Sequence, residues 1–446
     1  MKITKHPRAW VVTVDMGYGH QRAVYPLRHL AYKNIITANN YRGIPLEDKS
    51  IWEKSERFYE AVSRFKRIPV IGEMVFNLYD HFQAIAPLYP KRDLSKPTLP
   101  VIEMDHMIRK GWGKHLIDKL RKRSTLPIVT SFFITALMAD IHGYPGPIYC
   151  IICDADFSRS WVSEDPKKSR IQYFASNYRV VERLKLYGVP DERIFLTGFP
   201  LPKENIGNGQ LVEIKKDLLN RLPNLDPQRR YIRQYHETIR EQLDGAAPKR
   251  SPHKLTLMFA VGGAGAQADV AGVILRSLGT YLKRKQLEIV LVAGVREDVK
   301  QTFLKAISDL QLKQCYKRNI HIVYEATKNA YFESFNHHLR SIDVLWTKPS
   351  ELCFYTALGV PLIMAPAIGS QEKFNKLWLK SLGAGITQQD PQYTNEWFFD
   401  WLESGCLAEA AMQGFLEAPR YGTYNIETIL AQHPEKVKEV RTVLQY

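Results

Sequence analysis

The chain has 446 residues and a mass of 51.5 kDa, which is too long for one ordinary core, so two domains are expected. Hydrophobic residues make up 45% and aromatic residues 11% of the chain, a composition that excludes an intrinsically disordered protein. The net charge of +16 favours an anionic partner, but no helix-turn-helix, zinc-finger or RNA-binding motif accompanies it, so nucleic acid is not expected.

The N-terminus, MKITKHPRAWVV, has neither the apolar stretch nor the cleavage site of a signal peptide. The longest apolar stretches, such as 126–141, contain Pro, Thr or Ser and are too short to span a membrane. We therefore expect a cytoplasmic protein with at most peripheral membrane contact. The spacing of Cys150 and Cys153 has no second pair, which predicts buried cysteines on a strand and no zinc site.

The first half of the chain alternates short β-branched runs with amphipathic stretches, which predicts an α/β domain with a parallel sheet. Helical spacing appears at 51–66 and 113–123. The predicted strands are 9–14, 34–38, 127–132, 147–153, 171–175 and 193–198.

The stretch VDMGYGHQRA follows the first of these strands directly. Gly17 and Gly19 precede His20, so the backbone turns tightly beside an imidazole. The glycines predict a loop that lets an acceptor or a phosphate come close. A simple turn with His20 as a capping residue remains the alternative.

Residues 64–92 mix aromatic and aliphatic side chains with basic residues at both ends. Such a segment could lie on a membrane and admit a lipid acceptor. The alternative is a helical subdomain packed on the first domain.

Residues 201–253 are polar, charged and poor in strand formers, which predicts a linker with a helical insertion, including a surface helix at 231–243. A second α/β set follows, with strands at 255–261, 287–294, 320–326, 343–348 and 361–366. We therefore expect an N-terminal Rossmann-like domain at 1–200, the linker at 201–253, a second Rossmann-like domain at 254–415 and a helical segment at 416–446. That last segment could pack back on the N-terminal domain, and a ligand would bind between two such domains at the carboxyl ends of their strands.

A glycine-rich turn opens the second domain. The strand ending at Val261 is followed by Gly262, Gly263 and Gly265 and then by a helix, an arrangement that suits a phosphate. The spacing differs from G-x-G-x-x-G, and no acidic residue ends the next strand, so a nicotinamide cofactor is not expected. Packing alone is the other explanation for the turn.

Residues 343–385 carry most of the candidate binding groups. Thr347 and Lys348 end a strand, and Ser350 is the expected N-cap of the helix that follows. Further along, Gln371, Glu372 and Asn375 fall near the start of another helix, where they could hydrogen-bond sugar hydroxyls or simply form a polar helix start.

These motifs together resemble the GT-B glycosyltransferases, and most of all the family of monogalactosyldiacylglycerol synthases, diacylglycerol glucosyltransferases and the peptidoglycan N-acetylglucosaminyltransferase. The segment after Asp343 matches the family's D-x-x-x-T-K, G-x-P-x-I and Q-E-x-x-N patterns. The stretches MGYGHQRA, IICDADFSRSW, GVPDERIFLTGFPL and AGVREDVKQTFLKAI match its other motifs in the same order. The resemblance covers most of 9–201 and 255–385.

The resemblance implies two Rossmann-like domains facing across a cleft, and inverting sugar transfer from a nucleotide-diphosphate sugar, such as a UDP-sugar, to an acceptor hydroxyl. It implies no metal or other cofactor. Imidazole titrates near neutral pH, so His20 is the candidate base, with Asp154 either orienting it or acting itself.

The donor side of the site is implied by the same resemblance. Gly262, Gly263, Gly265, Thr347, Lys348 and Ser350 would hold the diphosphate, and Gln371, Glu372 and Asn375 would contact the donor sugar. Phe354 stands where the family has a ribose-binding Glu, and Glu351 could replace that contact. Cys153 replaces the usual Thr before Asp154.

Two other functions fit this architecture. A UDP-N-acetylglucosamine 2-epimerase would act on the nucleotide sugar without an acceptor. A non-catalytic protein that binds a nucleotide sugar or a lipid would explain the missing ribose-binding Glu.

Overall fold

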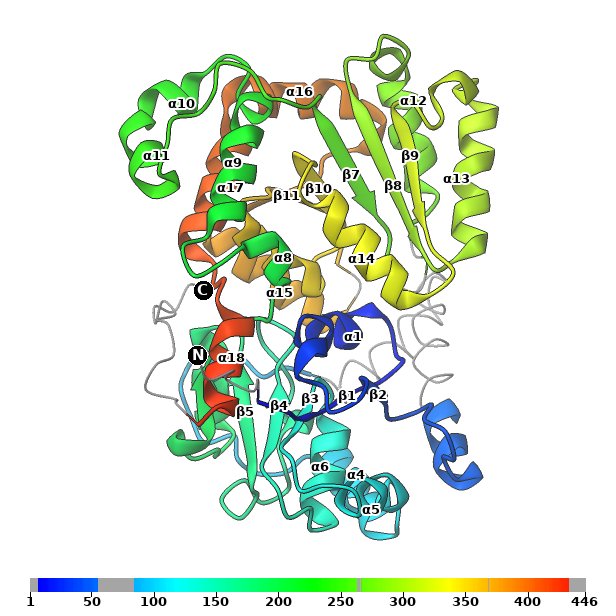
Figure 1. The fold of residues 1–446 in the computed structure, drawn as a ribbon, viewed down its shortest axis with the longest axis vertical. Helices are drawn as coiled ribbons and strands as arrows, with labels where there is room; N and C mark the ends of the chain where they lie inside the picture. Colours follow the sequence, from blue (N-terminus) through cyan, green and yellow to red (C-terminus); the bar gives the residue numbers. More distant parts are fainter. Residues whose placement is uncertain (1–6, 55–83, 263–264, 266, 368, 433–446) are drawn as a thin grey trace, which may run out of the picture. The chain divides into compact units, whose positions relative to one another are not determined.

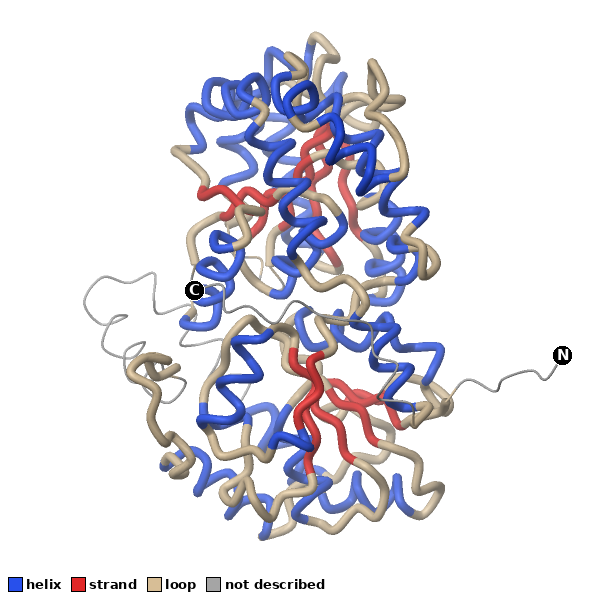
Figure 2. The backbone as a smooth tube through the Cα atoms, turned by 90° about the vertical axis from the view of Figure 1, so that its left-hand side faces the viewer, coloured by secondary structure: helices blue, strands red, loops and turns tan. Residues whose placement is uncertain are grey.

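The structure is a computed structural model that describes residues 7–54, 84–262, 265, 267–367 and 369–432. The chain forms two compact units. Unit 1 consists of Met1–Leu201, Ile368–Asn375 and Pro419–Gln445, and unit 2 of Pro202–Ala367 and Lys376–Ala418. Each unit contains a six-stranded sheet with helices on both faces (Figures 1 and 2).

The sheet of unit 1 is entirely parallel and has the order β2-β1-β3-β4-β5-β6. Its strands are β1 (Trp10–Thr13), β2 (Ile36–Thr37), β3 (Ile128–Thr130), β4 (Ile148–Ile151), β5 (Ile171–Ala175) and β6 (Ile194–Leu196). All six lie within the predicted ranges, because each is a short β-branched run bounded by turn-forming residues. The winding direction reverses between β1 and β3.

The helical elements of unit 1 connect these strands. They are α1 (Tyr18–Val24), η1 (Tyr25–Leu30), α4 (Leu99–Arg109), α5 (Lys114–Arg121), α6 (Phe133–Ile141), η2 (Arg159–Trp161), α7 (Tyr178–Leu186), η3 (Asp191–Arg193) and α18 (Gly422–Leu430). The helix predicted at 113–123 is therefore confirmed as α5. Of the one predicted at 51–66, residues 51–54 are helical, and the remainder lies outside the described residues, as does most of the segment 64–92.

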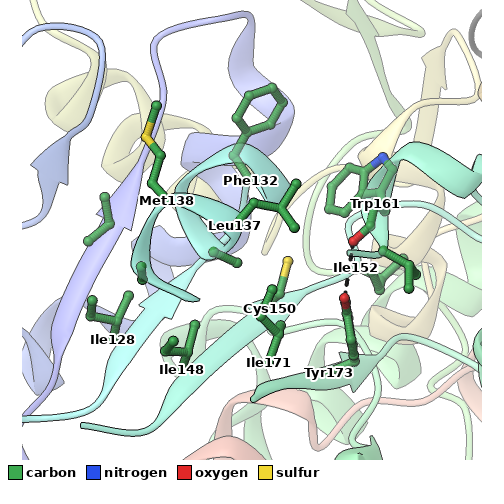
Figure 3. Packing of buried hydrophobic residues seen from close by; sticks show 14 of the residues in the cluster. Ile128, Phe132, Leu137, Met138, Ile148, Cys150, Ile152, Trp161, Ile171 and Tyr173 are labelled. Atoms are coloured by element: carbon green, nitrogen blue, oxygen red, sulfur yellow. Dashed lines mark hydrogen bonds between the residues drawn. The ribbon is translucent and has the colours of Figure 1, made fainter. Parts of the chain in front are cut away.

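The core of unit 1 lies between its sheet and the helices that cover it (Figure 3). Ile128, Ile148 and Ile171 occupy matching positions on neighbouring strands, and Cys150 lies among them with no exposed surface. Cys153 is also buried, just beyond the end of β4. The prediction of two buried cysteines is confirmed, since a thiol behaves here as a small apolar group.

The sheet of unit 2 is also parallel and has the order β12-β11-β10-β7-β8-β9. Its strands are β7 (Thr256–Ala260), β8 (Glu288–Gly294), β9 (Ile320–Tyr324), β10 (Val344–Thr347), β11 (Leu362–Met364) and β12 (Gly385–Thr387). The first five were predicted, whereas β12 was missed. It is three residues long and begins with a glycine, so it carries almost no β-strand signal.

The helices of unit 2 include the segment expected as a linker. They are α8 (Lys203–Ile206), α9 (Val212–Leu225), α10 (Arg230–Gln234), α11 (His236–Leu243), α12 (Val270–Lys283), α13 (Glu297–Asp309), η4 (Lys313–Cys315), α14 (Lys328–His338), η5 (Glu351–Leu358), α15 (Ser370–Ser381), η6 (Pro391–Tyr393), α16 (Thr394–Ser404) and α17 (Cys406–Glu417). The first part of α15, up to Asn375, belongs to unit 1. The helix predicted at 231–243 is broken at Tyr235, whose backbone is not helical (φ −113°).

Helix α9 is anchored in unit 2 through Arg221, which is buried. Its guanidinium donates to the carbonyl oxygens of Ile342 (2.7 Å) and Gly359 (2.8 Å), and also to those of Leu339 and Leu358. The helix ends at 339 and 358–359 leave carbonyls without helical partners, and the single side chain satisfies them.

Candidate functional site

In each unit, some of the candidate residues follow the two strands between which the winding direction reverses, whereas Asp154 follows β4. His20 follows β1 and Ser131 follows β3 in unit 1, while Gly262 follows β7 and Lys348 follows β10 in unit 2. In open parallel sheets this edge is where the connecting loops diverge and leave room for a ligand. Each unit therefore presents its candidate residues at the position that the topology favours for binding.

His20 lies in the first turn of α1 and is half-buried. Gly17 before the helix has φ +84°, a conformation that favours glycine, and Gly19 lies within the first turn. The Nδ1 atom of His20 is 2.8 Å from the carbonyl oxygen of Ser131. A carbonyl oxygen can only accept, so Nδ1 carries the proton, and in the neutral ring Nε2 is the basic nitrogen.

Aromatic side chains fix the orientation of the His20 ring. The Phe132 ring meets it edge to face, with centroids 4.7 Å apart, and the Trp161 centroid lies at 6.0 Å. Both aromatic residues are buried and belong to the core cluster of unit 1. The imidazole is thus held by packing as well as by the Ser131 carbonyl.

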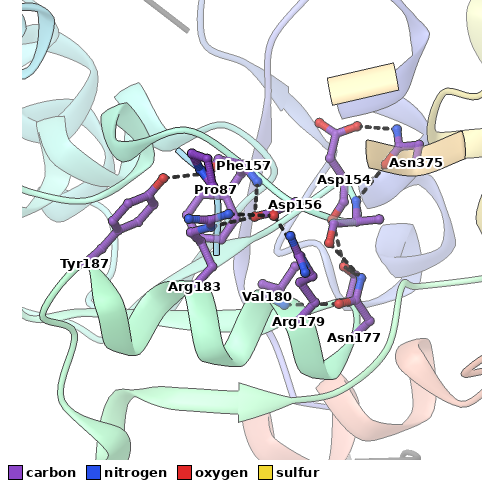
Figure 4. Close-up of polar contacts among 12 residues, drawn as sticks. Pro87, Asp154, Asp156, Phe157, Asn177, Arg179, Val180, Arg183, Tyr187 and Asn375 are labelled. Carbon is purple, nitrogen blue, oxygen red and sulfur yellow. Dashed lines mark hydrogen bonds and ion pairs between the residues drawn. The ribbon is translucent and has the colours of Figure 1, made fainter. Parts of the chain in front are cut away.

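Asp154 follows β4 and is held by Asn375 from the first turns of α15 (Figure 4). The Asn375 amide nitrogen donates to Asp154 Oδ1 (2.8 Å), and the Ala155 N–H donates to its amide oxygen (2.7 Å). Asn375 has no exposed surface, so both ends of its amide are used by this loop. Its geometry is that of a residue that positions Asp154.

The loop after β4 is also tied to α7 by a buried ionic cluster that sequence reasoning missed. The carboxylate of Asp156 accepts from Arg183 Nε (2.8 Å) and Arg179 Nε (3.0 Å), and all three side chains are buried (Figure 4). The sequence does contain the residues of this cluster, namely an aspartate in DADF and two arginines four residues apart on a helix. Charge pairing across that distance in sequence cannot be recognised without the fold.

Cys153, which stands where the resemblance implies a threonine, fits inside the same loop. Cys153 is 3% exposed, and its thiol donates to the Ser131 carbonyl oxygen at 3.4 Å, the atom that also holds His20. One backbone carbonyl therefore connects the His20 ring with the strand end that carries Asp154.

In unit 2, the glycine turn after β7 is shaped by Lys348. The Gly265 N–H donates to the Gly262 carbonyl oxygen at 2.8 Å, which closes the turn, while Gly263 lies outside the described residues. A Cβ atom at position 262 would lie 2.5 Å from Lys348 Cε and 3.3 Å from its Nζ. The end of the lysine side chain thus lies directly over the turn and would have to move if position 262 carried a Cβ.

A second cation lies close to the turn, at Gly265. Gly265 has φ +69°, and a Cβ there would lie 3.4 Å from the Arg296 guanidinium carbon. Arg296 also makes a bidentate ion pair with Asp298, at 3.0 and 2.6 Å. A lysine and an arginine beside one turn are cations that can pair with a phosphate.

Two further residues predicted to bind the donor lie at the end of β10 and just after it, namely Thr347 and Ser350. The Thr347 hydroxyl is buried and donates to the Ala260 carbonyl oxygen at 3.0 Å, so it links β10 to β7. Ser350 occupies the N-cap position as predicted, but the helix is a 3-10 helix and the serine side chain makes no capping bond. Its N–H instead donates to the Lys348 carbonyl oxygen at 2.8 Å, which bends the chain before the helix.

The resemblance implies a ribose-binding Glu at position 354, where the structure has a buried phenylalanine in an apolar contact. Phe354 is 1% exposed, and its ring packs against Trp378 with centroids 4.9 Å apart. Glu351 begins η5 and is 9% exposed. Gln371 and Glu372 lie in the first turn of α15 and are partly exposed.

Within the residues that the structure describes, no three His, Cys, Asp or Glu side chains come together as a metal site. The same residues contain no helix that is both long and apolar enough to cross a membrane. The structure brings His20, Ser131, Asp154 and Asn375 together in unit 1, and Gly262, Gly265, Arg296 and Lys348 in unit 2.

Comparison with known proteins agrees with the motifs. No protein-family model matches the chain. A processive diacylglycerol β-glucosyltransferase of Bacillus licheniformis is 22% identical over 385 residues, which cover 84% of this chain and 82% of that protein. The enzyme of the same name from Bacillus cytotoxicus is also 22% identical, and the match covers 98% of this chain and 96% of the relative.

Among solved structures, the UDP-GlcNAc 2-epimerase of Neisseria meningitidis bound to UDP-GlcNAc is similar with a TM-score of 0.45 and 14% identity. The match covers 82% of this chain and 88% of that one. The two parallel, doubly wound units have the architecture that the GT-B resemblance predicts. The chain is similar over most of its length to the processive diacylglycerol β-glucosyltransferases, which confirms the resemblance seen in its motifs.

Proposed function

We propose that the protein is an inverting glycosyltransferase that moves a sugar from a UDP-sugar to a hydroxyl group of a lipid acceptor. The observation that carries the proposal is the tautomer of His20, which the Ser131 carbonyl fixes with Nε2 as the basic nitrogen. The names of the two Bacillus relatives support the transfer of a glucosyl group and a diacylglycerol-based acceptor.

In the proposed reaction, His20 Nε2 removes the proton from the acceptor hydroxyl as its oxygen attacks the anomeric carbon. The bond from that carbon to the diphosphate breaks, and attack from the opposite face inverts the configuration. The imidazolium that forms is stabilised by the Ser131 carbonyl oxygen at Nδ1. We assign Asp154 to orienting the acceptor or the imidazolium, and Asn375 to positioning Asp154.

The departing diphosphate needs positive charge. We assign that role to Lys348 over the glycine turn, together with Arg296. The buried Thr347 hydroxyl donates to the Ala260 carbonyl oxygen. We therefore assign Thr347 to holding the end of β10 against β7, and not to contacting the donor through its hydroxyl. Gln371 and Glu372 are the proposed contacts to the donor sugar, and Glu351 to the ribose.

A lipid acceptor requires the protein to work at a membrane surface. We propose that it does so from the cytoplasm as a peripheral protein, which the net charge of +16 supports by attraction to anionic headgroups. Incubation with a panel of nucleotide sugars, with and without lipid extract, tests the function. Release of nucleoside diphosphate only when lipid is present is expected. Isomerised sugar without release would indicate an epimerase, and binding without conversion a non-catalytic protein.

The role of His20 is tested by His20→Ala. Because a general base typically contributes about 10²–10⁴-fold to the rate, we expect kcat to fall by that factor while UDP binding is retained. His106→Ala is the matched control, since His106 is exposed on α4 and lies outside the site. Turnover retained in His20→Ala would contradict the assignment.

A further inference from the structure

Unit 1 contains a cavity of about 310 Å³ between the edge strand β2 and helix α5. Its apolar wall includes Trp10 and Ile36 from the sheet and Leu116 and Leu120 from α5. Trp10 is the first residue of β1, whereas His20 follows the carboxyl end of that strand. None of the residues that line the cavity belongs to the candidate site described above.

Four cationic side chains surround this apolar wall. Lys33 and Arg42 come from the segments flanking β2, and Lys119 and Arg123 from α5 and its C-terminal end. Among the residues that the structure describes, no aspartate or glutamate lines the cavity. Within the described part of the chain, none of the four cations forms an ion pair with a carboxylate. Their mutual repulsion is therefore not relieved by a direct ion pair with any carboxylate of the described residues.

Neighbouring groups hold parts of this cavity in place. Lys119 donates to the Arg42 carbonyl oxygen, and its ammonium lies 5.1 Å from the centroid of the Tyr41 ring. The only N–H of the Trp10 indole is used by the Ser124 carbonyl oxygen at 3.2 Å. The tryptophan therefore presents hydrocarbon surface to the cavity and offers no further donor to a ligand.

We propose that this cavity binds a single-chain organic anion, namely a carboxylate with an unbranched hydrocarbon tail, such as a medium-chain fatty acid. The volume lies at the lower end of the ~300–1,000 Å³ typical of small-molecule sites, which suits one chain and not two. The tail buries apolar surface against Trp10, Ile36 and Leu120, and the carboxylate meets the unpaired cations at the rim.

Isothermal titration of the full chain with decanoate, below its micelle concentration, tests the proposal. One decanoate is expected to bind, 1-decanol at least tenfold more weakly, and acetate without measurable heat. The comparison separates the contributions of the tail and the charge. Equal affinity for decanol and decanoate, or no binding of decanoate, would overturn the proposal.

Two variants locate the site. Arg123→Glu replaces an attraction by a repulsion and is expected to raise the decanoate Kd at least tenfold. Lys122→Glu makes the same charge change one residue earlier at an exposed position that does not line the cavity, and should leave the Kd unchanged. Ile36→Trp should fill the cavity and also abolish binding.

Equal weakening by Arg123→Glu and Lys122→Glu would show that decanoate responds only to net charge, and would overturn the proposal. So would loss of binding to anionic phospholipid vesicles in Arg123→Glu with decanoate binding unchanged. These titrations measure no sugar transfer, so their failure is distinguishable from failure of the proposed transferase activity.

Discussion

At Gly262 the space for a side chain is already occupied by Lys348. The lysine Cε would be 2.5 Å from any Cβ at that position, well inside van der Waals contact. Position 262 is not among the residues with positive φ, so the demand for glycine comes from the lysine and not from backbone strain. The glycine and the cation therefore act as one unit in the proposed phosphate site.

We predict that Gly262→Ala displaces Lys348 and weakens UDP binding about tenfold, because a hydrogen bond to a charged group is worth roughly 1.5–3 kcal/mol. Titration of the variant with UDP measures the effect. Gly279→Ala in α12, where a Cβ would meet nothing within 4 Å, is the control and should leave UDP affinity unchanged. Its stability should rise by about 0.5–1 kcal/mol, since alanine favours a helix. Unchanged UDP affinity in Gly262→Ala would remove Lys348 from the phosphate site.

Residue roles were the least predictable part of the sequence. Asn375 could be placed near the start of a helix from its spacing, but not paired with Asp154 and Ala155, because those contacts join segments more than 200 positions apart. Thr347 matched a motif, whereas the use of its hydroxyl by Ala260 depends on the neighbouring strand. Motifs identify which residues gather at a site, and the packing decides which atoms remain available.

Helix α4 carries a carboxylate on its buried face. Asp105 is 2% exposed, and burial raises its pKa to about 6, with Glu164 adding to the rise. Arg109, at 3.5 Å, acts in the opposite direction. Arg159 is a further nearby cation, whose own pKa burial lowers. The helix therefore holds a carboxyl group that keeps its proton to a higher pH in the folded state than in the unfolded chain.

This preference predicts the sign of a pH effect on stability. A carboxyl whose pKa is higher in the folded than in the unfolded state binds more protons when folded, so its contribution is lost as pH rises. This loss of stability is expected between about pH 4, the usual pKa of an unfolded aspartate, and about pH 6, the pKa of Asp105 in the folded state. We expect the free energy of unfolding to decrease less between pH 4 and 7 in Asp105→Asn than in the parent protein. Urea titrations at each pH measure it, and parallel curves for the two proteins would contradict the assignment.

At the level of elements, strands were easier to predict than helices. Eleven of the described strands fell within predicted ranges because they are short, mostly apolar runs between turns, and among the described strands only β12 was missed. The break at Tyr235 and the 3-10 form of η5 were not visible, since both depend on how the segments pack. Every residue of η5 is buried, so tertiary contacts outweigh local propensity there.

At the level of the whole molecule, the two units are not continuous in sequence. Helix α18 comes near the end of the sequence but belongs to unit 1, where Asn425 donates to the Thr197 carbonyl oxygen (2.9 Å) and Thr423 to that of Leu201 (2.6 Å). Glu427 forms an ion pair with His29. A Cβ at Gly422 would lie 2.1 Å from the Phe199 carbonyl oxygen, so the helix start fits closely against the end of the first segment.

We predict that Gly422→Ala destabilises the protein by about 1–3 kcal/mol, because the added methyl group forces the backbone of α18 away from Phe199. Chemical denaturation followed by circular dichroism measures the change. Gly272→Ala, where a Cβ would make an ordinary 3.6 Å contact with Ala306, should be neutral or stabilising. A Gly422→Ala protein as stable as the parent would show that this contact relaxes without cost.

The return of the chain to unit 1 also has a consequence during synthesis. Ribosomes add roughly 5–20 residues per second, so about 10–40 seconds pass between the emergence of Leu201 and that of Pro419. Throughout this interval the nascent first segment lacks the partner of its Thr197 and Leu201 carbonyls, while the chain of unit 2 is being made. Unit 1 begins to form first but can only be completed last, after translation has reached α18.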